Sequence, residues 1–125
     1  MATSKQLLLK VSTNTNQFVN LNCKKFTNLY ISNSDSEDIT INVAIGKDDN
    51  AGQTSITNGA YFLEGVTIPM GVTMHVPGIN FSQLRGADAV SGGQAALTGA
   101  LREDDYTLLI SAGATNKIYT IFLEY

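Results

Sequence analysis

The sequence predicts an all-β fold, a single antiparallel β-sandwich with jelly-roll-like connections and about eight strands. Three observations predict it. Apolar residues recur at every second position in several short segments, runs of Gly, Asn, Asp and Ser separate these segments, and no segment has a convincing amphipathic helix pattern. At 125 residues the chain has the size of one domain. We therefore expect one sandwich over 1–125, with one long Gly/Ala-rich loop or arm inserted at 77–104.

Alternation of apolar and polar residues predicts four strands in the first half of the chain, at 5–11, 18–23, 28–32 and 39–45. Within the third of these, Tyr30 and Ser32 are expected to point outward because they alternate with apolar neighbours. The fourth carries β-branched residues along one face, opposite small or polar residues. It is therefore expected to be a central strand.

The segment 60–76 has the strongest turn signal in the chain. Pro69 presets φ for the first corner of a type I turn, Met70 takes the second corner, and Gly71 supplies a residue that tolerates positive φ. Apolar residues alternate on both sides of this turn. The pattern predicts a β-hairpin with one apolar face.

A second hairpin is predicted from 106–111 and 118–125, which alternate on either side of a short polar turn. Both faces of the last segment carry bulky residues, with Tyr119, Ile121 and Leu123 on one face and Phe122 on the other. This pattern indicates either a central strand or contact with another subunit.

Between 77 and 105 the alternation stops, and glycines occur at positions 86, 92, 93 and 99. Loops of this length tend to be functional or ordered by a partner. Residues 94–102 could form a short helix or remain a loop, and the sequence leaves both open. We expect partner contacts at exposed apolar and basic residues of this arm and at the chain end. These are Phe81, Leu84, Arg85, Leu97, Leu101 and Tyr125.

Composition and charge argue against several classes of function. The net charge is -3, and the eight Lys and Arg residues are spread along the chain, so no nucleic-acid partner is expected. No apolar run approaches the roughly 20 residues that cross a bilayer, and the start of the chain does not have the pattern of a signal peptide. We therefore expect a soluble, unprocessed chain. The single cysteine, Cys23, allows no intrachain disulfide.

Few residues offer catalytic or metal-binding chemistry. His75 is the only histidine, which argues against metal sites that need two imidazoles. A nucleophilic pair of Cys23 and His75 stays open, but no motif frames it. The pattern favours a Cys23 that packs as a small hydrophobe and a His75 that points outward from a strand beside Val76. We expect no enzymatic activity, catalytic residue, metal site or cofactor.

Three acidic clusters could in principle hold calcium or supply paired carboxylates, at 35–38, 48–49 and 103–105. None has the spacing of an EF-hand loop, and solvated loops are the favoured interpretation of all three. There is no Trp, and the other aromatic residues occur mainly at positions typical of the core. This distribution argues against a sugar-binding face.

The turn residues Val66, Ile68, Pro69, Gly71 and Thr73, together with the last segment from Asp105 to Glu124, resemble those of a group of small β-sandwich virion proteins of tailed bacteriophages. In that group, a Tyr- or Phe-rich strand leads into a turn with the pattern V-x-I-P-x-G-x-T. This sequence matches that turn at Val66, Ile68, Pro69, Gly71 and Thr73. The group's final segment is matched at Asp105, Leu108, Ser111, Ala112, Asn116, Leu123 and Glu124. The resemblance covers 28–76 and 101–125, and the chain departs from the pattern at 77–100.

The resemblance implies a non-enzymatic structural protein of a phage particle. The expected function is that of a capsid decoration or cement protein, made in the host bacterial cytoplasm and located on the capsid surface of the virion. Its partners would be the major capsid protein and copies of itself, with a homotrimer as the expected oligomer. The alternatives are a neck, tail or fibre component, or a module that binds host-surface carbohydrate.

Overall fold

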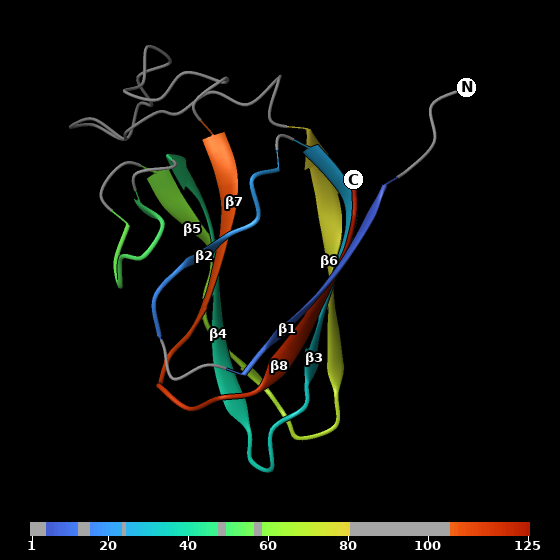
Figure 1. The fold of residues 1–125 in the computed structure, drawn as a ribbon, viewed down its shortest axis with the longest axis vertical. Helices are drawn as coiled ribbons and strands as arrows, with labels where there is room; N and C mark the ends of the chain where they lie inside the picture. Colours follow the sequence, from blue (N-terminus) through green and yellow to red (C-terminus); the bar gives the residue numbers. More distant parts are fainter. Residues whose placement is uncertain (1–4, 13–15, 24, 48–49, 57–58, 81–105) are drawn as a thin grey trace, which may run out of the picture.

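The computed structural model describes residues 5–12, 16–23, 25–47, 50–56, 59–80 and 106–125. These residues form eight strands in two four-stranded antiparallel sheets that pack face to face (Figure 1). In chain order the strands are β1 (Gln6–Val11), β2 (Val19–Asn20), β3 (Lys25–Asn33), β4 (Ile39–Lys47), β5 (Gly59–Ile68), β6 (Thr73–Asn80), β7 (Tyr106–Ala112) and β8 (Tyr119–Glu124). The predicted all-β sandwich is confirmed.

The order of the strands is that of a jelly roll. Sheet A has the order β1-β8-β3-β6, and sheet B has the order β2-β7-β4-β5. The first strand pairs with the last, the second with the seventh, the third with the sixth and the fourth with the fifth. Pairing of β3 with β8 and of β4 with β7 then completes the two sheets. The fold is therefore one long antiparallel ribbon rolled into two layers.

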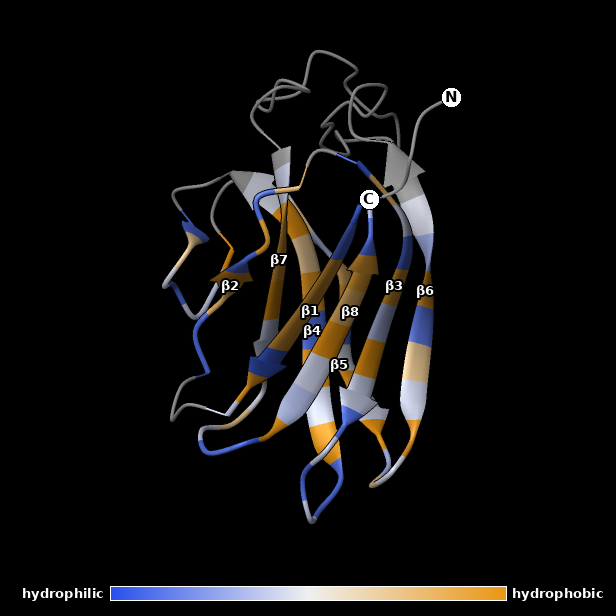
Figure 2. Cartoon of the chain, turned by 45° about the vertical axis from the view of Figure 1, so that its right-hand side comes forward, coloured by the Kyte–Doolittle hydropathy of each residue, from blue (hydrophilic) through white to orange (hydrophobic). Residues whose placement is uncertain are grey.

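Alternating side chains build the core between the sheets. On β3, Leu29 and Ile31 are fully buried, as are Ile41 and Val43 on β4 and Ile121 on β8. Figure 2 shows the consequence as alternating apolar and polar bands along the strands of sheet A, whose outer face is turned toward the viewer. Each fully buried Leu or Ile side chain contributes about 1.5–3 kcal/mol relative to an exposed one. The expected central position of the fourth strand is also confirmed, since β4 lies between β7 and β5.

The hairpin predicted over 60–76 is wrong. The turn itself has the expected chemistry, because Gly71 has a φ of 79° and the Val72 N–H donates to the Pro69 carbonyl at 3.1 Å. However, β5 pairs with β4 in sheet B, whereas β6 pairs with β3 in sheet A. The turn is therefore a crossover between the two layers. Side-chain alternation defines the two faces of a strand, but it does not determine which strand pairs with it.

The hairpin predicted from the last two strands is wrong for the same reason. β7 belongs to sheet B and β8 to sheet A, so the residues between Ala112 and Tyr119 form another crossover. Of the two explanations for the bulky faces of β8, the central position is confirmed, because β8 lies between β1 and β3. Tyr119 and Ile121 face the core, and Phe122 lies on the outer face.

Two predicted boundaries also change. The strand expected at 18–23 contains only the two residues of β2, although the Leu21 N–H still donates to the Leu108 carbonyl at 3.0 Å. The arm was expected to begin at Pro77, but β6 continues through Pro77 to Asn80. It does so as an edge strand, where a residue without an N–H is tolerated. Residues 81–105, including the possible helix at 94–102, lie outside the described residues.

Part of the outer face of sheet B is covered by loops. Phe18 packs against Ala44 and Leu109, which point away from the main core, and forms a small second core with them. Two backbone hydrogen bonds hold the covering segment in place, from the Phe18 N–H to the Gln53 carbonyl at 2.8 Å and from the Gly52 N–H to the Phe18 carbonyl at 3.1 Å. Among the described residues, no helix has the length and apolarity that crossing a membrane requires.

Candidate functional site

Four side chains form a row across the outer face of sheet A, which we call the outer row. It consists of Leu8 on β1, Phe122 on β8, Tyr30 on β3 and His75 on β6. The strand register places Leu8 opposite Phe122, Phe122 opposite Tyr30, and Tyr30 opposite His75. All four point outward because the neighbouring residues along each strand point into the sandwich. The outer row therefore spans the whole width of the sheet.

The rings of the outer row hold one another in position. The rings of Tyr30 and His75 are stacked, with centroids 4.7 Å apart and planes at 18°. The ring of Phe122 lies 6.0 Å from that of Tyr30 at a tilt of 46°. Cross-strand pairs of this kind contribute roughly 0.2–1 kcal/mol each. Leu8, at the end of the row, is 70% exposed, so the apolar surface continues to the edge of the sheet.

Polar side chains flank the outer row on one side. Nε2 of His75 lies 2.7 Å from Oδ1 of Asn28, and because this amide oxygen can only accept, we assign the proton to Nε2. Nδ2 of Asn28 in turn donates to Oε1 of Glu124 at 3.4 Å. The main-chain oxygen of Glu124 accepts a hydrogen bond from Oγ1 of Thr27 at 3.1 Å. These contacts form a polar chain from β6 across β3 to β8.

Hydroxyl groups flank the outer row on its other side. Oγ of Ser32 and Oγ1 of Thr73 share a hydrogen bond of 2.5 Å between β3 and β6. The Ser34 and Thr120 hydroxyls are 3.4 Å apart, between the end of β3 and β8. An apolar centre bordered by satisfied polar groups is the arrangement found at protein interaction surfaces. The outer face of sheet A has this arrangement, with the outer row bordered by hydrogen-bonded polar groups.

The nucleophilic pair of Cys23 and His75 that the sequence left open is wrong. Cys23 belongs to the core, and its thiol donates to the Lys25 carbonyl at 2.7 Å. Burial raises the pKa of this thiol above its ordinary value of 9.0, which disfavours the reactive thiolate. His75 is exposed on the outer face of sheet A, whereas Cys23 is buried. Cys23 therefore packs as the small hydrophobe that the sequence pattern favoured.

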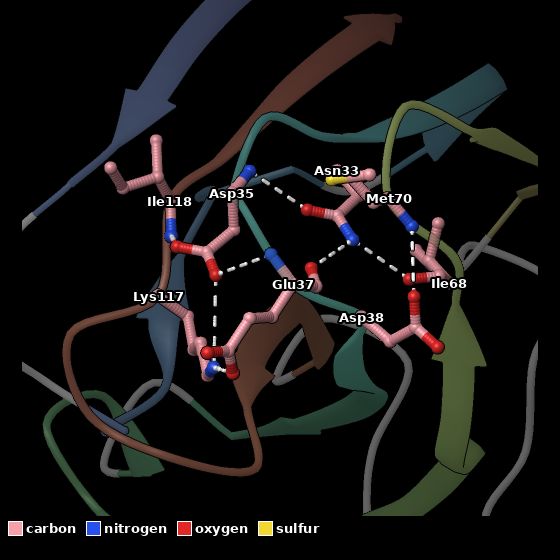
Figure 3. A network of polar contacts seen from close by, with 8 residues as sticks. All are labelled: Asn33, Asp35, Glu37, Asp38, Ile68, Met70, Lys117 and Ile118. Atoms are coloured by element: carbon pink, nitrogen blue, oxygen red, sulfur yellow. Dashed lines mark hydrogen bonds and ion pairs between the residues drawn. The ribbon is translucent and has the colours of Figure 1, made fainter.

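The first acidic cluster is partly structural. Both oxygens of Asp35 accept main-chain hydrogen bonds, from the Glu37 N–H at 3.2 Å and the Ile118 N–H at 3.3 Å. Nζ of Lys117 lies 3.7 Å from Asp35 and 3.4 Å from Glu37 (Figure 3). The Asp35 side chain is only 10% exposed, so the interpretation as a solvated loop is wrong for this residue. Its contacts join the β3–β4 and β7–β8 crossovers at one end of the sandwich.

Other acidic residues do not form a metal site in the described part of the chain. Glu37 and Asp38 are exposed as expected, and Oδ1 of Asp38 accepts a hydrogen bond from the Met70 N–H at 3.1 Å. No group of three or more His, Cys, Asp or Glu residues with the geometry of a metal site occurs among the described residues. The acidic clusters at 48–49 and 103–105 lie outside the described residues.

Of the six predicted partner-binding residues, the structure describes only Tyr125. Its ring is exposed at the end of the chain, and its backbone exchanges two hydrogen bonds with Lys5, of 2.6 and 2.8 Å. Phe81, Leu84, Arg85, Leu97 and Leu101 lie outside the described residues. The predicted contacts of these five residues remain predictions.

The sequence analysis missed the outer row. It placed the aromatic residues mainly in the core, whereas Tyr30, Phe122 and the imidazole of His75 lie together outside it. The sequence did contain one signal, because each of these three residues alternates with more buried neighbours along its strand. Alternation could place each ring on an outer face, but only the register of two nonlocal strand pairs, β3 with β6 and β3 with β8, could place the rings in one row.

Part of each stretch that carries the resemblance maps to a crossover between the sheets. The residues from Val66 to Thr73 surround the β5–β6 crossover, and those from Ser111 to Asn116 form much of the β7–β8 crossover. Gly71 and Asn116 each adopt positive φ there, at 79° and 62°. These motifs therefore specify turns of the fold. Comparison of the chain with protein-family models, with curated proteins and with solved structures finds no match.

Proposed function

We propose that this chain is a non-enzymatic structural protein of a tailed-phage particle, a decoration protein that acts as a homo-oligomer. It would bind across adjacent major capsid subunits on the outside of the shell and stabilise the assembled state. A ligand that binds only the assembled state shifts the assembly equilibrium by mass action. The resemblance of the two crossover motifs to small virion β-sandwich proteins gives the proposal its biological context.

The observation that carries the proposal is the outer row. It offers a strip of one leucine and three rings that crosses all four strands of sheet A, and Tyr30 and His75 are already stacked, with ring centroids 4.7 Å apart. A surface that is ordered before binding loses little conformational entropy when a partner covers it. Aromatic residues in such a position frequently dominate the binding free energy.

The test is binding of the purified protein to capsid shells that lack it, followed by sedimentation of the shells. The double variant Tyr30→Ser, Phe122→Ser should bind at least tenfold more weakly, because two aromatic contacts are lost. Phe62→Ser removes an exposed aromatic side chain from β5 in sheet B and serves as the matched control, with unchanged binding expected. Circular dichroism confirms that each variant is folded.

Copy number separates a decoration protein from a neck, tail or fibre component. Quantitative mass spectrometry of purified virions should find hundreds of copies per particle if the chain decorates the shell. A count of about a dozen or fewer would contradict the proposal and favour the neck, tail or fibre. Complete absence from particles would contradict every virion function.

A module that binds host-surface carbohydrate is the second candidate. It is favoured by the position of Asn28 and Glu124 beside the rings of the outer row, because amide and carboxylate groups can bind sugar hydroxyls. However, stacking of His75 on Tyr30 covers ring faces that a sugar would need for its own stacking. We therefore place this candidate second. A glycan array with the purified protein tests it, and selective binding that Asn28→Ala abolishes would support it.

A further inference from the structure

The four sheet edges differ in how well they are protected against pairing with another strand. The edge strand β6 contains Pro77, and β2 has only two residues. The pairing of β5 with β4 contains register shifts. Gly65 in β5 has a φ of 68°, and its N–H donates a hydrogen bond to Oδ1 of Asn42 at 2.8 Å. Proline, bulges, short length and charged side chains, especially lysine, are the usual means of blocking an edge. β1 has no proline and no bulge, since its six residues pair with β8 without a shift, and Lys10 is its only charged residue.

The hydrogen bonds of β1 identify the backbone groups on its outer edge. Lys5 and Tyr125 exchange both of their backbone hydrogen bonds, so they form a hydrogen-bonded pair. Such pairs alternate along an antiparallel ladder. The N–H and C=O groups of Gln6, Leu8 and Lys10 therefore point away from β8. Among the described residues, β8 is the only strand that pairs with β1.

We propose that a second copy of this chain pairs with this edge, β1 against β1 in antiparallel orientation, with Leu8 opposite Leu8 of the second copy. In this register the two Leu8 residues exchange two hydrogen bonds. Gln6 of each copy then exchanges two more with Lys10 of the other, so every edge group identified above is satisfied. The arrangement is two-fold symmetric and closed, as in most homodimers.

The side chains agree with the same register. On the outer face, Leu8 meets Leu8 and Gln6 meets Lys10, so no like charges are opposed. On the inner face, Leu7 meets Leu9, which continues the apolar side of the sheet. A shift that centred the pairing on Lys10 would place two lysines opposite each other. The sequence of β1 is thus self-complementary about Leu8.

Pairing in this register explains why the apolar surface continues to the sheet edge. Leu8 is 70% exposed in the single chain, and it would be covered in the pair. The outer rows of the two copies would join into one strip across a continuous eight-stranded sheet. This inference does not depend on the function proposed above. It also differs from the threefold arrangement that the resemblance implies, so the two arrangements predict different masses.

Cysteine cross-linking of the full chain tests the register. Hydrogen-bonded antiparallel partners have Cα atoms about 5.5 Å apart, which is within reach of a disulfide. Leu8→Cys should cross-link with itself under mild oxidation. Gln6→Cys should cross-link only when it is mixed with Lys10→Cys. Cys23 is buried, so the unchanged protein should give no cross-link. Self cross-linking of Gln6→Cys that exceeds the mixed product would overturn the register.

Light scattering after size exclusion tests the dimer itself. The unchanged protein should have twice the mass of the 13.4 kDa chain at high concentration and should dissociate on dilution. Leu8→Lys, which opposes two charges at the centre, should weaken dimerisation at least tenfold while circular dichroism stays unchanged. Val72→Lys replaces another exposed apolar residue and should leave the dimer intact. A monomer at all concentrations, a trimer, or a dimer that Leu8→Lys does not weaken would overturn the proposal.

Discussion

The side-chain amide of Asn33 donates a hydrogen bond of 2.8 Å to the main-chain carbonyl of Ile68. Asn33 ends β3 in sheet A and Ile68 ends β5 in sheet B, so this bond joins the two layers (Figure 3). The same amide donates to the Glu37 carbonyl at 2.9 Å, and its oxygen accepts from the Asp35 N–H at 2.8 Å. Because Asn33 is only 4% exposed, water cannot replace these bonds.

Replacement of Asn33 by Ala should lower the free energy of unfolding by about 2–4 kcal/mol, since buried carbonyl groups would lose their donor. Urea denaturation followed by circular dichroism measures the effect. Ser34→Ala changes the neighbouring exposed residue and should alter stability by less than about 0.5 kcal/mol. Equal stability of the two variants would show that Asn33 does not join the layers energetically.

The charged variant Asn33→Asp provides a second measurement at the same position. At neutral pH it would place a carboxylate against the carbonyl oxygens of Ile68 and Glu37, so it should be less stable than Asn33→Ala. These surroundings would raise the folded-state pKa of the new carboxyl group. The stability of this variant relative to the unchanged protein should therefore increase as the pH falls through that pKa. A difference that is independent of pH between 4 and 8 would contradict this explanation.

The β5–β6 crossover shows which part of the fold the sequence could predict. Pro69 and Gly71 determine a tight turn through backbone preferences that act over four residues, and this part of the prediction is confirmed. The same turn can end either a hairpin or a crossover. The choice depends on contacts with Asn33, which accepts a hydrogen bond from the Gly71 N–H at 3.3 Å and donates one to the Val72 carbonyl at 3.0 Å. These contacts are distant in sequence and leave no periodic signal.

The candidate site was less predictable than the fold. The outward direction of Tyr30 follows from the buried residues on either side of it, and the sequence analysis made this prediction correctly. Stacking of Tyr30 on His75 depends on the pairing of β3 with β6, which the sequence analysis did not predict. Without this pairing, the site could not be recognised from the sequence. A periodic pattern carries no information about strand order in a sheet.

Because the edge strand β6 packs closely against β3, we expect that replacing Gly78 by a residue with a side chain lowers stability. A Cβ atom at Gly78 would meet the main-chain oxygen of Phe26 and would lie 2.6 Å from the Cα atom of Thr27. Since these are backbone atoms, Gly78→Ala should cost about 2–4 kcal/mol.

Gly71 is the matched control for Gly78, because a Cβ atom there would meet nothing within 4 Å and only the φ of 79° opposes it. Gly71→Ala should therefore cost about 1 kcal/mol. Thermal unfolding of both variants provides the comparison. A Gly78→Ala variant as stable as Gly71→Ala would show that β6 can move away from β3 at little cost.

Because Tyr119 is buried, we expect the protein to lose stability at high pH. Tyr119 is almost completely buried in the core, and desolvation raises the pKa of its phenol from the ordinary 10.0 to about 12. The folded state therefore favours the neutral phenol. This contribution is fully present below pH 10 and is lost as the pH rises from 10 to 12, by an amount on the order of 2 kcal/mol.

Urea denaturation at several pH values measures this loss, and Tyr119→Phe should lose less stability than the unchanged protein between pH 10 and 12. The raised pKa of Cys23 acts in the same direction from pH 9 upward, so Cys23→Ala should flatten the remaining slope. Identical pH profiles for the unchanged protein and Tyr119→Phe would contradict the prediction.

Deletion of residues 81–100 should leave a folded sandwich. Asn80 ends β6 and Tyr106 begins β7 at the same end of the molecule (Figure 1). Strands lie about 4.8 Å apart within a sheet, and packed sheets lie about 10 Å apart. Because β6 and β7 are in different sheets and two strand positions apart, these two ends are separated by about 14 Å. The remaining residues 101–105 can span roughly 20 Å when extended.

We expect a cooperative thermal transition in the deletion variant and weaker binding to capsid shells. Replacement of the same residues by a Gly/Ser linker of equal length is the control, and loss of folding in both variants would show that the segment belongs to the core.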